Sequence, residues 1–225
     1  MAWHDGAVTT LGFLGGTGDQ GRGLARRFAL AGHDVLLGSR SPERAEAAAE
    51  SLRAGLPAGA GVSGAGNAEV AARCEIAVVA VPYDGHAALL VDLAELLRGK
   101  IVVDCVNPLG FDGKGAYPLD VPEGSAAEQA AALLPESTIV AAFHHISAVL
   151  LLDPAVESVD TDVLVLGDDR EATDAIQDLV GAISGMRGIY AGRLRNARQV
   201  EALTANLISI NRRYKVHAGI RVTDV

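Results

Sequence analysis

Along roughly the first two thirds of the chain, short apolar runs alternate with longer alanine-rich segments of helical character. Such alternation is typical of βαβ units, in which each helix carries the chain back so that successive strands run parallel. The expected strands are 9–14, 34–38, 76–81, 101–105 and 138–143. The helices expected between them are 19–30, 42–53, 68–73, 85–97 and 126–134. We therefore predict an α/β protein with a doubly wound parallel sheet.

Local sequence signals support two of the helix starts and indicate two loops. Ser41 is a favourable capping residue, and a proline follows it at the first helical position. Ser125 begins a capping box that Glu128 completes. The Gly/Ala/Ser-rich residues 55–66 are expected to form a loop around a short edge strand. Residues 107–124, rich in glycine and proline, are expected to form a surface loop.

After residue 143 the pattern changes to a smaller α/β extension that ends in a long helix. We expect strands at 162–166 and 188–191, a helix at 171–183 and a final helix at 196–214. We accordingly divide the chain into residues 1–143 and residues 144–225. In the final helix, apolar residues at helical spacing form one face, and this face either packs on the protein's own sheet or forms the seam of a two-fold dimer. These residues are Val200, Leu203, Leu207 and Ile210.

Composition narrows the class of protein and its location. The 225 residues are 49% hydrophobic and carry a formal net charge of −9, with no long block of like charge. We therefore expect no nucleic-acid partner. Cys74 and Cys105 lie in apolar surroundings and are expected to be buried thiols in a reducing compartment. The opening residues 1–5 lack a basic start with a long apolar run, and no apolar stretch reaches membrane-spanning length, so we expect a cytoplasmic protein.

The most informative motif is a glycine-rich turn between the first expected strand and the first expected helix. Gly16, Gly18 and Gly21 form the pattern Gly-x-Gly-x-x-Gly. In this context the pattern seats a dinucleotide pyrophosphate on helix amides, because glycine permits the tight turn and the close approach of backbone to phosphate. Thr17 and Gln20 are placed to present side chains or amides to phosphate. The first 143 residues are therefore expected to form a Rossmann-type nucleotide-binding domain.

About twenty residues later, the second strand ends in a serine and an arginine. An acidic residue at this point would bind the ribose hydroxyl of NAD, whereas Ser39 and Arg40 offer a hydroxyl and a guanidinium. Arg44 lies one turn into the next helix, so that both guanidiniums can converge near a positive helix N-terminus. This substitution favours the 2′-phosphate of NADP. The competing interpretation is that both arginines are solvated surface residues.

Three further strand ends lie on the side of the sheet where parallel-sheet proteins bind ligands. Pro82 and Tyr83 follow one strand and Asn107 follows the next, so these residues are expected near the nicotinamide half of a dinucleotide, unless each simply forms a turn. His144 and His145 follow another strand. Neighbouring strand residues point to opposite faces, so we expect no metal site there and favour one ring facing the cleft as a hydrogen-bond donor.

No catalytic side-chain constellation stands out in the sequence. We find no Ser/His/Asp set, no Cys/His set and no paired acids, so we assign no catalytic residue. Hydride transfer between two bound cofactors is compatible with this, because it requires orientation more than side-chain acids.

Taken together and in order, several short motifs resemble those of the NADPH-dependent coenzyme F420 reductases, also called F420H2:NADP oxidoreductases. The resemblance covers nearly the whole chain, and it rests on residues 14–25 (LGGTGDQGRGLA), 31–33 (AGH), 38–40 (GSR), 100–103 (KIVV), 125–128 (SAAE), 167–169 (GDD) and 200–204 (VEALT). The chain differs from the usual family pattern at His145, where a smaller polar residue is usual, and at Ser147, where a proline often stands.

The resemblance implies an enzyme that exchanges a hydride between C4 of NADPH and C5 of the deazaflavin coenzyme F420. It implies that the two rings stack in a cleft between the nucleotide domain and the C-terminal part, with the His144 segment and residues 217–219 beside the deazaflavin. It also suggests a homodimer. Combined with the strand-end positions, it gives this set of cofactor-contacting residues: Gly16, Thr17, Gly18, Asp19, Gln20, Gly21, Ser39, Arg40, Arg44, Pro82, Tyr83, Asn107, His144, Ala148 and Ala218.

Two other functions remain open from the sequence. One is another small NADP-dependent reductase, acting on an imine or a free flavin. The other is a module that senses a dinucleotide without catalysis, although that reading does not account for the C-terminal part.

Overall fold

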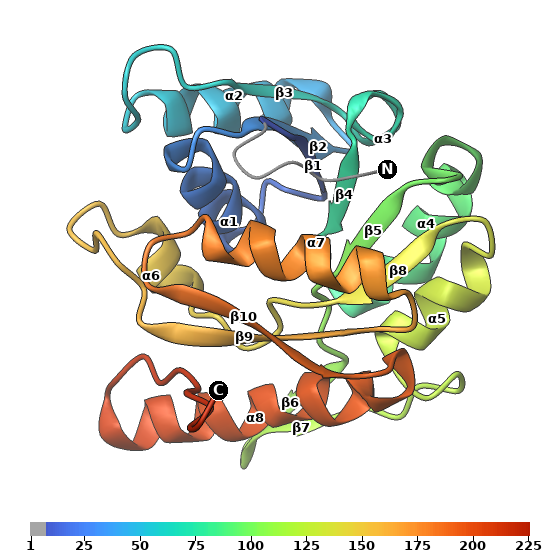
Figure 1. Ribbon diagram of the computed structural model, residues 1–225, viewed down its shortest axis with the longest axis vertical. Helices are drawn as coiled ribbons and strands as arrows, with labels where there is room; N and C mark the ends of the chain where they lie inside the picture. The colour runs from blue at the N-terminus through green and yellow to red at the C-terminus, as the bar shows by residue number, and fades with distance from the viewer. Residues whose placement is uncertain (1–7) are drawn as a thin grey trace.

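The sheet at the centre of the molecule has eight strands (Figure 1). The structure, a computed structural model, describes residues 8–225, so the opening residues discussed above lie outside the described part. The strands of this sheet are β1 (Thr10–Leu14), β2 (Asp34–Ser39), β3 (Val62–Gly66), β4 (Ile76–Val79), β5 (Ile101–Asp104), β8 (Thr138–Ala141), β9 (Thr161–Gly167) and β10 (Met186–Gly192).

The strand order confirms the predicted doubly wound arrangement. The order is β10-β9-β8-β5-β4-β1-β2-β3, so the chain starts in the middle, builds one side through β3 and then crosses to the other. Neighbouring strands are parallel except β8 and β9, which pair antiparallel at Val140–Gly167 and Ala141–Leu166. Because only these residues pair, the earlier part of β9 extends past the end of β8. The C-terminal part thus continues the same sheet beyond the carboxyl edge of β8.

Helices cover both faces of the sheet. They are α1 (Asp19–Leu30), α2 (Pro42–Arg53), α3 (Asn67–Arg73), α4 (His86–Leu97), α5 (Ala126–Leu133), α6 (Ala148–Leu152), α7 (Arg170–Gly181) and α8 (Ala197–Tyr214), with short 3-10 turns η1 (Tyr83–Gly85) and η2 (Leu194–Asn196). Both predicted caps are confirmed, since the hydroxyl of Ser41 accepts from the Arg44 amide and that of Ser125 from the Glu128 amide. These helix starts are therefore set by local sequence.

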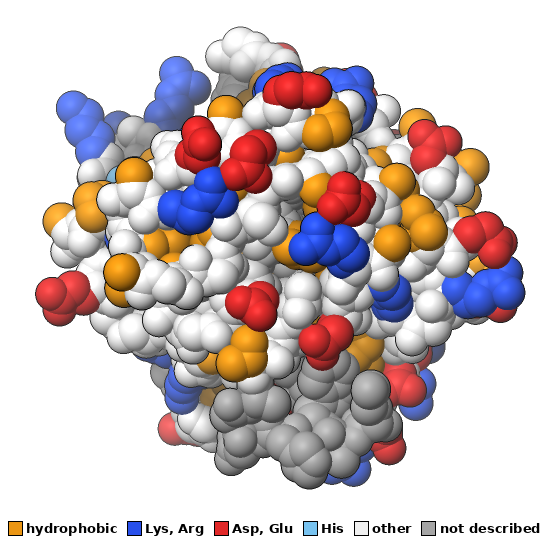
Figure 2. Space-filling view, turned by 90° about the horizontal axis from the view of Figure 1, so that it is seen from above, with side chains coloured by type: hydrophobic (Ala, Val, Ile, Leu, Met, Phe, Trp, Pro, Cys, Tyr) orange, Lys and Arg blue, Asp and Glu red, His pale blue; other side chains and the backbone are white. Residues whose placement is uncertain are grey.

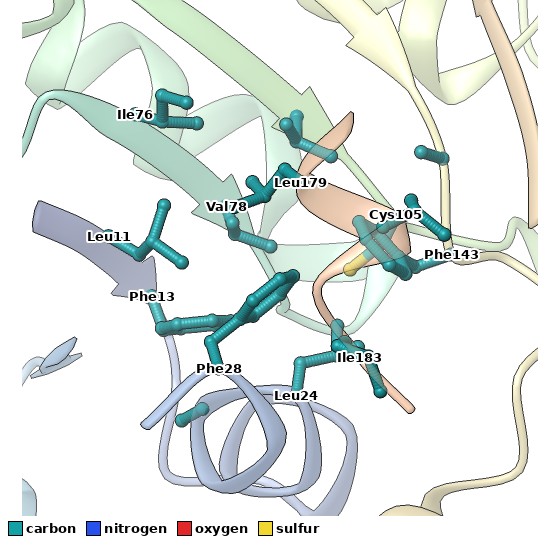
Figure 3. Packing of buried hydrophobic residues seen from close by; sticks show 14 of the residues in the cluster. Leu11, Phe13, Leu24, Phe28, Ile76, Val78, Cys105, Phe143, Leu179 and Ile183 are labelled. Carbon is teal, nitrogen blue, oxygen red and sulfur yellow. The ribbon is translucent and has the colours of Figure 1, made fainter. Parts of the chain in front are cut away.

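Two apolar cores lie on opposite sides of the sheet. One contains buried residues of α1, α2, α6 and α7, and the other contains those of α3, α4, α5 and the first half of α8. In the first core, the Phe28 ring lies 6.3 Å from that of Phe13 and 5.9 Å from that of Phe143, measured between centroids (Figure 3). Aromatic contacts of this kind tie α1 both to β1 and to the segment that follows β8.

The structure differs from the sequence analysis in two places. Residues 107–124 are not loop throughout, because β6 (Leu109–Asp112) and β7 (Gly115–Pro118) pair as an antiparallel hairpin. At the turn, the Asp112 carboxylate accepts hydrogen bonds from the amides of Lys114 and Gly115, and Gly115 has φ of 128°, a conformation that favours glycine. The second correction is α6, which the sequence analysis did not predict.

The apolar face of α8 serves its own sheet along only part of its length. Val200 and Leu207 are buried, Leu203 is half-buried, and Ile210 is 40% exposed. The face therefore packs inside the molecule as far as Leu207, and its C-terminal end at Ile210 is exposed. Among the residues the structure describes, no helix has the length and apolar character needed to cross a membrane.

The C-terminal tail folds back onto the sheet after α8. The buried Asp162 carboxylate on β9 accepts hydrogen bonds from the Arg187 and Arg221 side chains and from the Val222 amide. Arg187 and its neighbouring hydrogen bonds lower the pKa of Asp162. A charged carboxylate thus fastens the tail beside the start of β9.

Candidate functional site

The glycine-rich turn joins β1 to α1 in the way that the sequence predicts. The Gly16 amide donates to the carbonyls of Phe13 and Gly38 at 3.0 and 2.9 Å. A Cβ on Gly21 would lie 2.6 Å from the Gly16 Cα, whereas a Cβ on Gly18 would meet nothing within 4 Å. Close packing therefore requires glycine at residue 21, and Gly18 borders open space. No side chain caps α1 at Gly18, which leaves first-turn amide donors available to an anion.

Two predicted residues in the first turn of α1 make protein contacts of their own. Asp19 forms an ion pair with Arg22 at 2.6 Å, so its charge beside the helix N-terminus is balanced. The side-chain amide of Gln20 donates to the Phe143 carbonyl at 3.2 Å. Thr17 is half-buried beside them. Gln20 therefore joins the glycine-rich turn to the segment after β8 as well as lying next to the open amides.

Ser39, Arg40 and Arg44 gather at the end of β2 and the N-terminus of α2. Ser39 is buried and its hydroxyl accepts from the Ser41 amide at 3.2 Å, while both arginines are exposed. Within residues 8–225, neither guanidinium has an ion pair or a side-chain hydrogen bond. Two uncompensated cations thus lie beside the positive end of a helix, where a dianionic phosphate is stabilised.

This local positive charge stands out against a mixed surface. On the face seen in Figure 2, acidic and basic side chains are interspersed among uncharged ones. Because the chain as a whole is acidic, an anionic ligand must be held by locally placed donors rather than by the overall field.

The strand ends of β4 and β5 lie next to each other, as the sequence predicts. Pro82 is exposed, Tyr83 is half-buried in η1, and Asn107 follows β5. The Asn107 side-chain amide donates to the His144 carbonyl at 2.8 Å, and the Thr204 hydroxyl of α8 donates to the same oxygen at 3.0 Å. Asn107 therefore fixes the segment after β8 rather than pointing freely into solution.

Both rings of the histidine pair are buried, which the sequence analysis did not predict. His144 is 3% exposed and both of its ring nitrogens lack a partner among the described residues. Nε2 of His145 accepts from the Leu164 amide at 3.4 Å, and its Nδ1 has no such partner. Burial lowers the pKa of each ring to about 4, so both are neutral at pH 7.

Phe143 precedes the pair in a strained backbone conformation, with φ of 63°. A bulky residue in this left-handed region is an outlier that persists only where the surroundings hold it. Here the contacts from Gln20, Asn107 and Thr204 hold the two carbonyls at residues 143 and 144. The strained residue thus lies next to the His144 segment, which the family resemblance implies to be beside the deazaflavin.

Two segments predicted to border one ligand do come together. A small hollow is lined by residues 145–147, Leu150, 159–161 and 217–219. Ser147 and His217 lie 3.3 Å apart across it, from Oγ to Nδ1, and the Ala218 amide donates to the Asn211 side chain at 2.7 Å. The returning C-terminal tail therefore forms one wall, and the start of β9 forms another.

Sequence reasoning missed the anchoring of α6, which begins at the predicted residue Ala148. Arg27 of α1 is buried and donates to the carbonyls of Leu150 and Leu151 at 2.5 and 2.9 Å. A Cβ on Gly23 would lie 2.7 Å from the Leu151 Cβ, so glycine lets the two helices approach. The three arginines of α1 carry no sequence signal for such a contact, because the partner carbonyls lie more than 120 residues away.

A second feature that the sequence did not predict is a group of buried ionisable residues where α4, β5 and α8 meet. His86 and Asp104 are fully buried, with His86 Nε2 2.6 Å from Asp104 Oδ2, and Glu201 is 2% exposed. The other ring nitrogen of His86 lies 2.9 Å from the Gln129 side-chain oxygen. Both ring nitrogens face acceptors, which indicates an imidazolium paired with the aspartate.

The chain is similar in sequence to one protein family and to several named enzymes. A family model described as "NADP oxidoreductase coenzyme F420-dependent" matches residues 10–108. The chain is 41% identical over 218 residues to the F420-dependent NADP reductase of Methanothermobacter marburgensis, covering 94% of this chain and 97% of that protein. It is 38% identical to the protein of the same name from Methanocaldococcus jannaschii, covering 96% of this chain and 98% of that one.

A solved structure from Arthrobacter sp. FB24 is similar to this protein over nearly the full length of the chain. That protein, provisionally assigned as an F420 dependent NADP-reductase, matches with a TM-score of 0.81 and 30% identity, over 96% of this chain and 100% of that chain. The similarity thus includes β9, β10 and α8 as well as the nucleotide-binding part.

Proposed function

Because the chain belongs to the family of F420-dependent NADP reductases, we propose that it transfers a hydride between NADP(H) and the deazaflavin coenzyme F420. The observation that carries this function is identity of about 40% to reductases of that name along nearly the whole chain. When bound, the two cofactors supply the chemistry, as the nicotinamide C4 and the deazaflavin C5 exchange the hydride. The protein binds and orients them.

We assign the NADP-binding residues from the donors that the structure leaves available. The amides around residues 18–21 would hold the pyrophosphate, since α1 has no side-chain cap and the space at Gly18 is open. Ser39, Arg40 and Arg44 would hold the 2′-phosphate. The strand ends at Pro82, Tyr83 and Asn107 would lie along the nicotinamide half, with backbone near Ala148 completing the site. These donors fit a phosphorylated dinucleotide in number, charge and order.

We assign the deazaflavin to the other side, between the 144–148 segment and the returning tail. The hollow beside Ser147, His217 and Ala218 supports this assignment. His145 is one of the residues that line this hollow, and its neutral imidazole suits a polar, uncharged heterocycle. We keep the division into a nucleotide-binding part, 1–143, and a deazaflavin-binding part, 144–225, which meet at the antiparallel pairing of β8 and β9.

Mixing the purified protein with NADPH and oxidised coenzyme F420 tests the function directly. Loss of the deazaflavin's visible absorption at a rate proportional to enzyme is expected. A matched reaction with free flavin or a cyclic imine in its place should be much slower. Turnover of either of these without turnover of the deazaflavin would contradict the proposal.

We further propose a homodimer in a reducing, cytoplasmic compartment. Ile210 and Tyr214 leave the outer end of α8 apolar at 40% and 69% exposure, and Phe111 of the neighbouring hairpin is 69% exposed. Cys74 and Cys105 are buried free thiols, which suits a reducing compartment. Light scattering should give twice the chain mass, and Ile210→Asp with Tyr214→Asp should halve it. An unchanged mass would contradict a seam at this face.

A further inference from the structure

Where α4, β5, α5 and α8 meet, three ionisable side chains are removed from solvent. They are His86, Asp104 and Glu201, with exposures of 0%, 0% and 2%. Of these, His86 and Asp104 face each other and largely balance in charge. Burial, with Asp104 nearby, raises the pKa of Glu201 to about 7, although His86 and two amides oppose the rise. A buried carboxyl group of this kind is unfavourable unless its contacts compensate it.

Glu201 makes its contacts with another helix rather than its own. Its Oε2 accepts from the Ala126 amide at 3.0 Å and its Oε1 from the Ala127 amide at 3.1 Å. The adjacent Glu128 amide is already capped by Ser125. The first turn of α5 is therefore satisfied jointly by a local serine and by a carboxylate from α8, 75 residues along the chain. A local cap would satisfy α5 equally well, so the distant one has the specific effect of joining α8 to α5.

One turn further along α8, Thr204 reaches the site. Its hydroxyl donates to the His144 carbonyl at 3.0 Å and lies 3.4 Å from the Asn107 side-chain oxygen. Residues three apart lie on one side of a helix, so the rotation of α8 that places Glu201 on α5 also places Thr204 on His144. Asp104 also helps to fix the backbone beside Asn107, because its Oδ1 accepts a hydrogen bond from the Val106 amide.

We propose that Glu201 is a positioning residue for hydride transfer: by clamping the N-terminus of α5 it fixes α8, and through Thr204 it holds the His144 segment against the deazaflavin. This role rests on the proposed function. The titratable groups that face Glu201 are Asp104, His86 and Tyr83. Arg40, Arg44 and the glycine-rich turn belong to other elements, so binding of the adenosine half of NADP is independent of the clamp.

Glu201→Gln is the decisive variant, because it keeps the shape and one acceptor but turns an NH2 group toward the second amide. We expect kcat/KM for coenzyme F420 to fall about tenfold or more, while the Kd for NADP stays within about twofold. The pH profile should also lose the inflection near neutral pH that the carboxyl group contributes. Glu201→Asp, which keeps the charge on a shorter arm, should recover part of the rate. Unchanged deazaflavin kinetics with only a lower Tm would overturn the proposal.

Glu128→Gln is the matched control, since Glu128 is a half-buried carboxylate in the same turn of α5 but bonds only to Ser125. It should leave the deazaflavin kinetics unchanged. Hydrogen exchange on the unliganded protein separates this inference from the function. Faster exchange at residues 143–147 in Glu201→Gln, but not in Glu128→Gln, supports the clamp even if the wild type does not turn over coenzyme F420. Equal exchange in both variants contradicts it.

Discussion

The side-chain amide of Gln20 donates to the carbonyl of Phe143, 123 residues away, and so links the first turn of α1 to a strained backbone position. The turn that we assign to the pyrophosphate and the segment that we assign to the deazaflavin are thereby in direct contact. The two half-sites that we assign are therefore joined by a side-chain hydrogen bond as well as by the sheet.

Replacing Gln20 by alanine removes that link. We expect the variant to lose about 1 kcal/mol of stability, because a partly buried carbonyl loses its donor, and to turn over the deazaflavin more slowly as residue 143 relaxes. Thermal unfolding and steady-state kinetics measure the two effects. Gln199→Ala, at an exposed position of α8, is the control and should change neither. Full activity in Gln20→Ala would show that the strained conformation is held without this contact.

Arg40→Asp should invert the nucleotide preference. The substitution removes one of two cations beside the N-terminus of α2 and places a carboxylate where a ribose hydroxyl can donate to it. We expect the Kd for NADP to rise by about tenfold or more and that for NAD to fall, as measured by calorimetry. Arg98→Asp changes the net charge equally at the exposed end of α4 and should leave both constants unchanged. Equal or tighter binding of NADP by Arg40→Asp would refute the assignment of the 2′-phosphate site.

The two buried histidines predict a loss of stability in acid. Folding lowers their pKa to about 4 from 6.5, so below pH 6.5 the unfolded chain binds protons that the folded chain does not. The free energy of unfolding is therefore unaffected by these rings above pH 6.5 and falls as the pH drops toward 4. The loss is on the order of 3 kcal/mol for each ring. The pKa of Glu201 is raised from 4.5 to about 7, so between these pH values the folded chain binds protons that the unfolded chain does not. This carboxyl group therefore lowers the stability as the pH rises through that range.

His145→Gln isolates one ring from these opposing effects. Denaturant unfolding between pH 4 and 6.5 should show a slope of free energy against pH that is smaller than wild type by about one proton. Gln199→Ala, which removes no ionisable group, should keep the wild-type slope. If His145→Gln also kept that slope, the ring would have to be protonated inside the folded protein.

Asp162→Asn should release the C-terminal tail. It removes the charge that Arg187 and Arg221 share, and a hydrogen bond to a charged group contributes about 1.5–3 kcal/mol. We expect faster proteolysis after residue 215 and a higher KM for the deazaflavin, with the Kd for NADP unchanged. The control is Asp160→Asn, because Asp160 also bonds to Arg221 but is 83% exposed. A tail equally protected in both variants would mean that other contacts hold it.

The sequence predicts the strands, most helices and the glycine-rich turn because their signals are local. Apolar runs, the Ser41 and Ser125 caps and the Gly16–Gly21 spacing each lie within a few residues. The hairpin at Leu109–Asp112 and Gly115–Pro118 escaped prediction because its glycines and prolines resemble loop composition. The five-residue α6 is too short to show a helical period.

The polar contacts that hold the site could not be predicted for a different reason. Glu201 and Ala126, or Arg27 and Leu151, are partners only because the sheet brings distant segments together. Nothing in the sequence around Glu201 separates it from a solvated helix residue, which is the usual state of a glutamate. Gln20 shows the same limit, since the sequence predicts its position beside the glycine-rich turn but not its hydrogen bond to Phe143.

The antiparallel pairing at Val140–Gly167 and Ala141–Leu166 makes β9 an extension of the nucleotide-binding sheet rather than a separate body on a linker. No hinge is available at this junction, because swinging the outer wall away would break backbone hydrogen bonds inside the sheet. The two half-sites that we assign therefore lie on one continuous sheet. We therefore expect both ligands to bind without a movement of β9 away from β8.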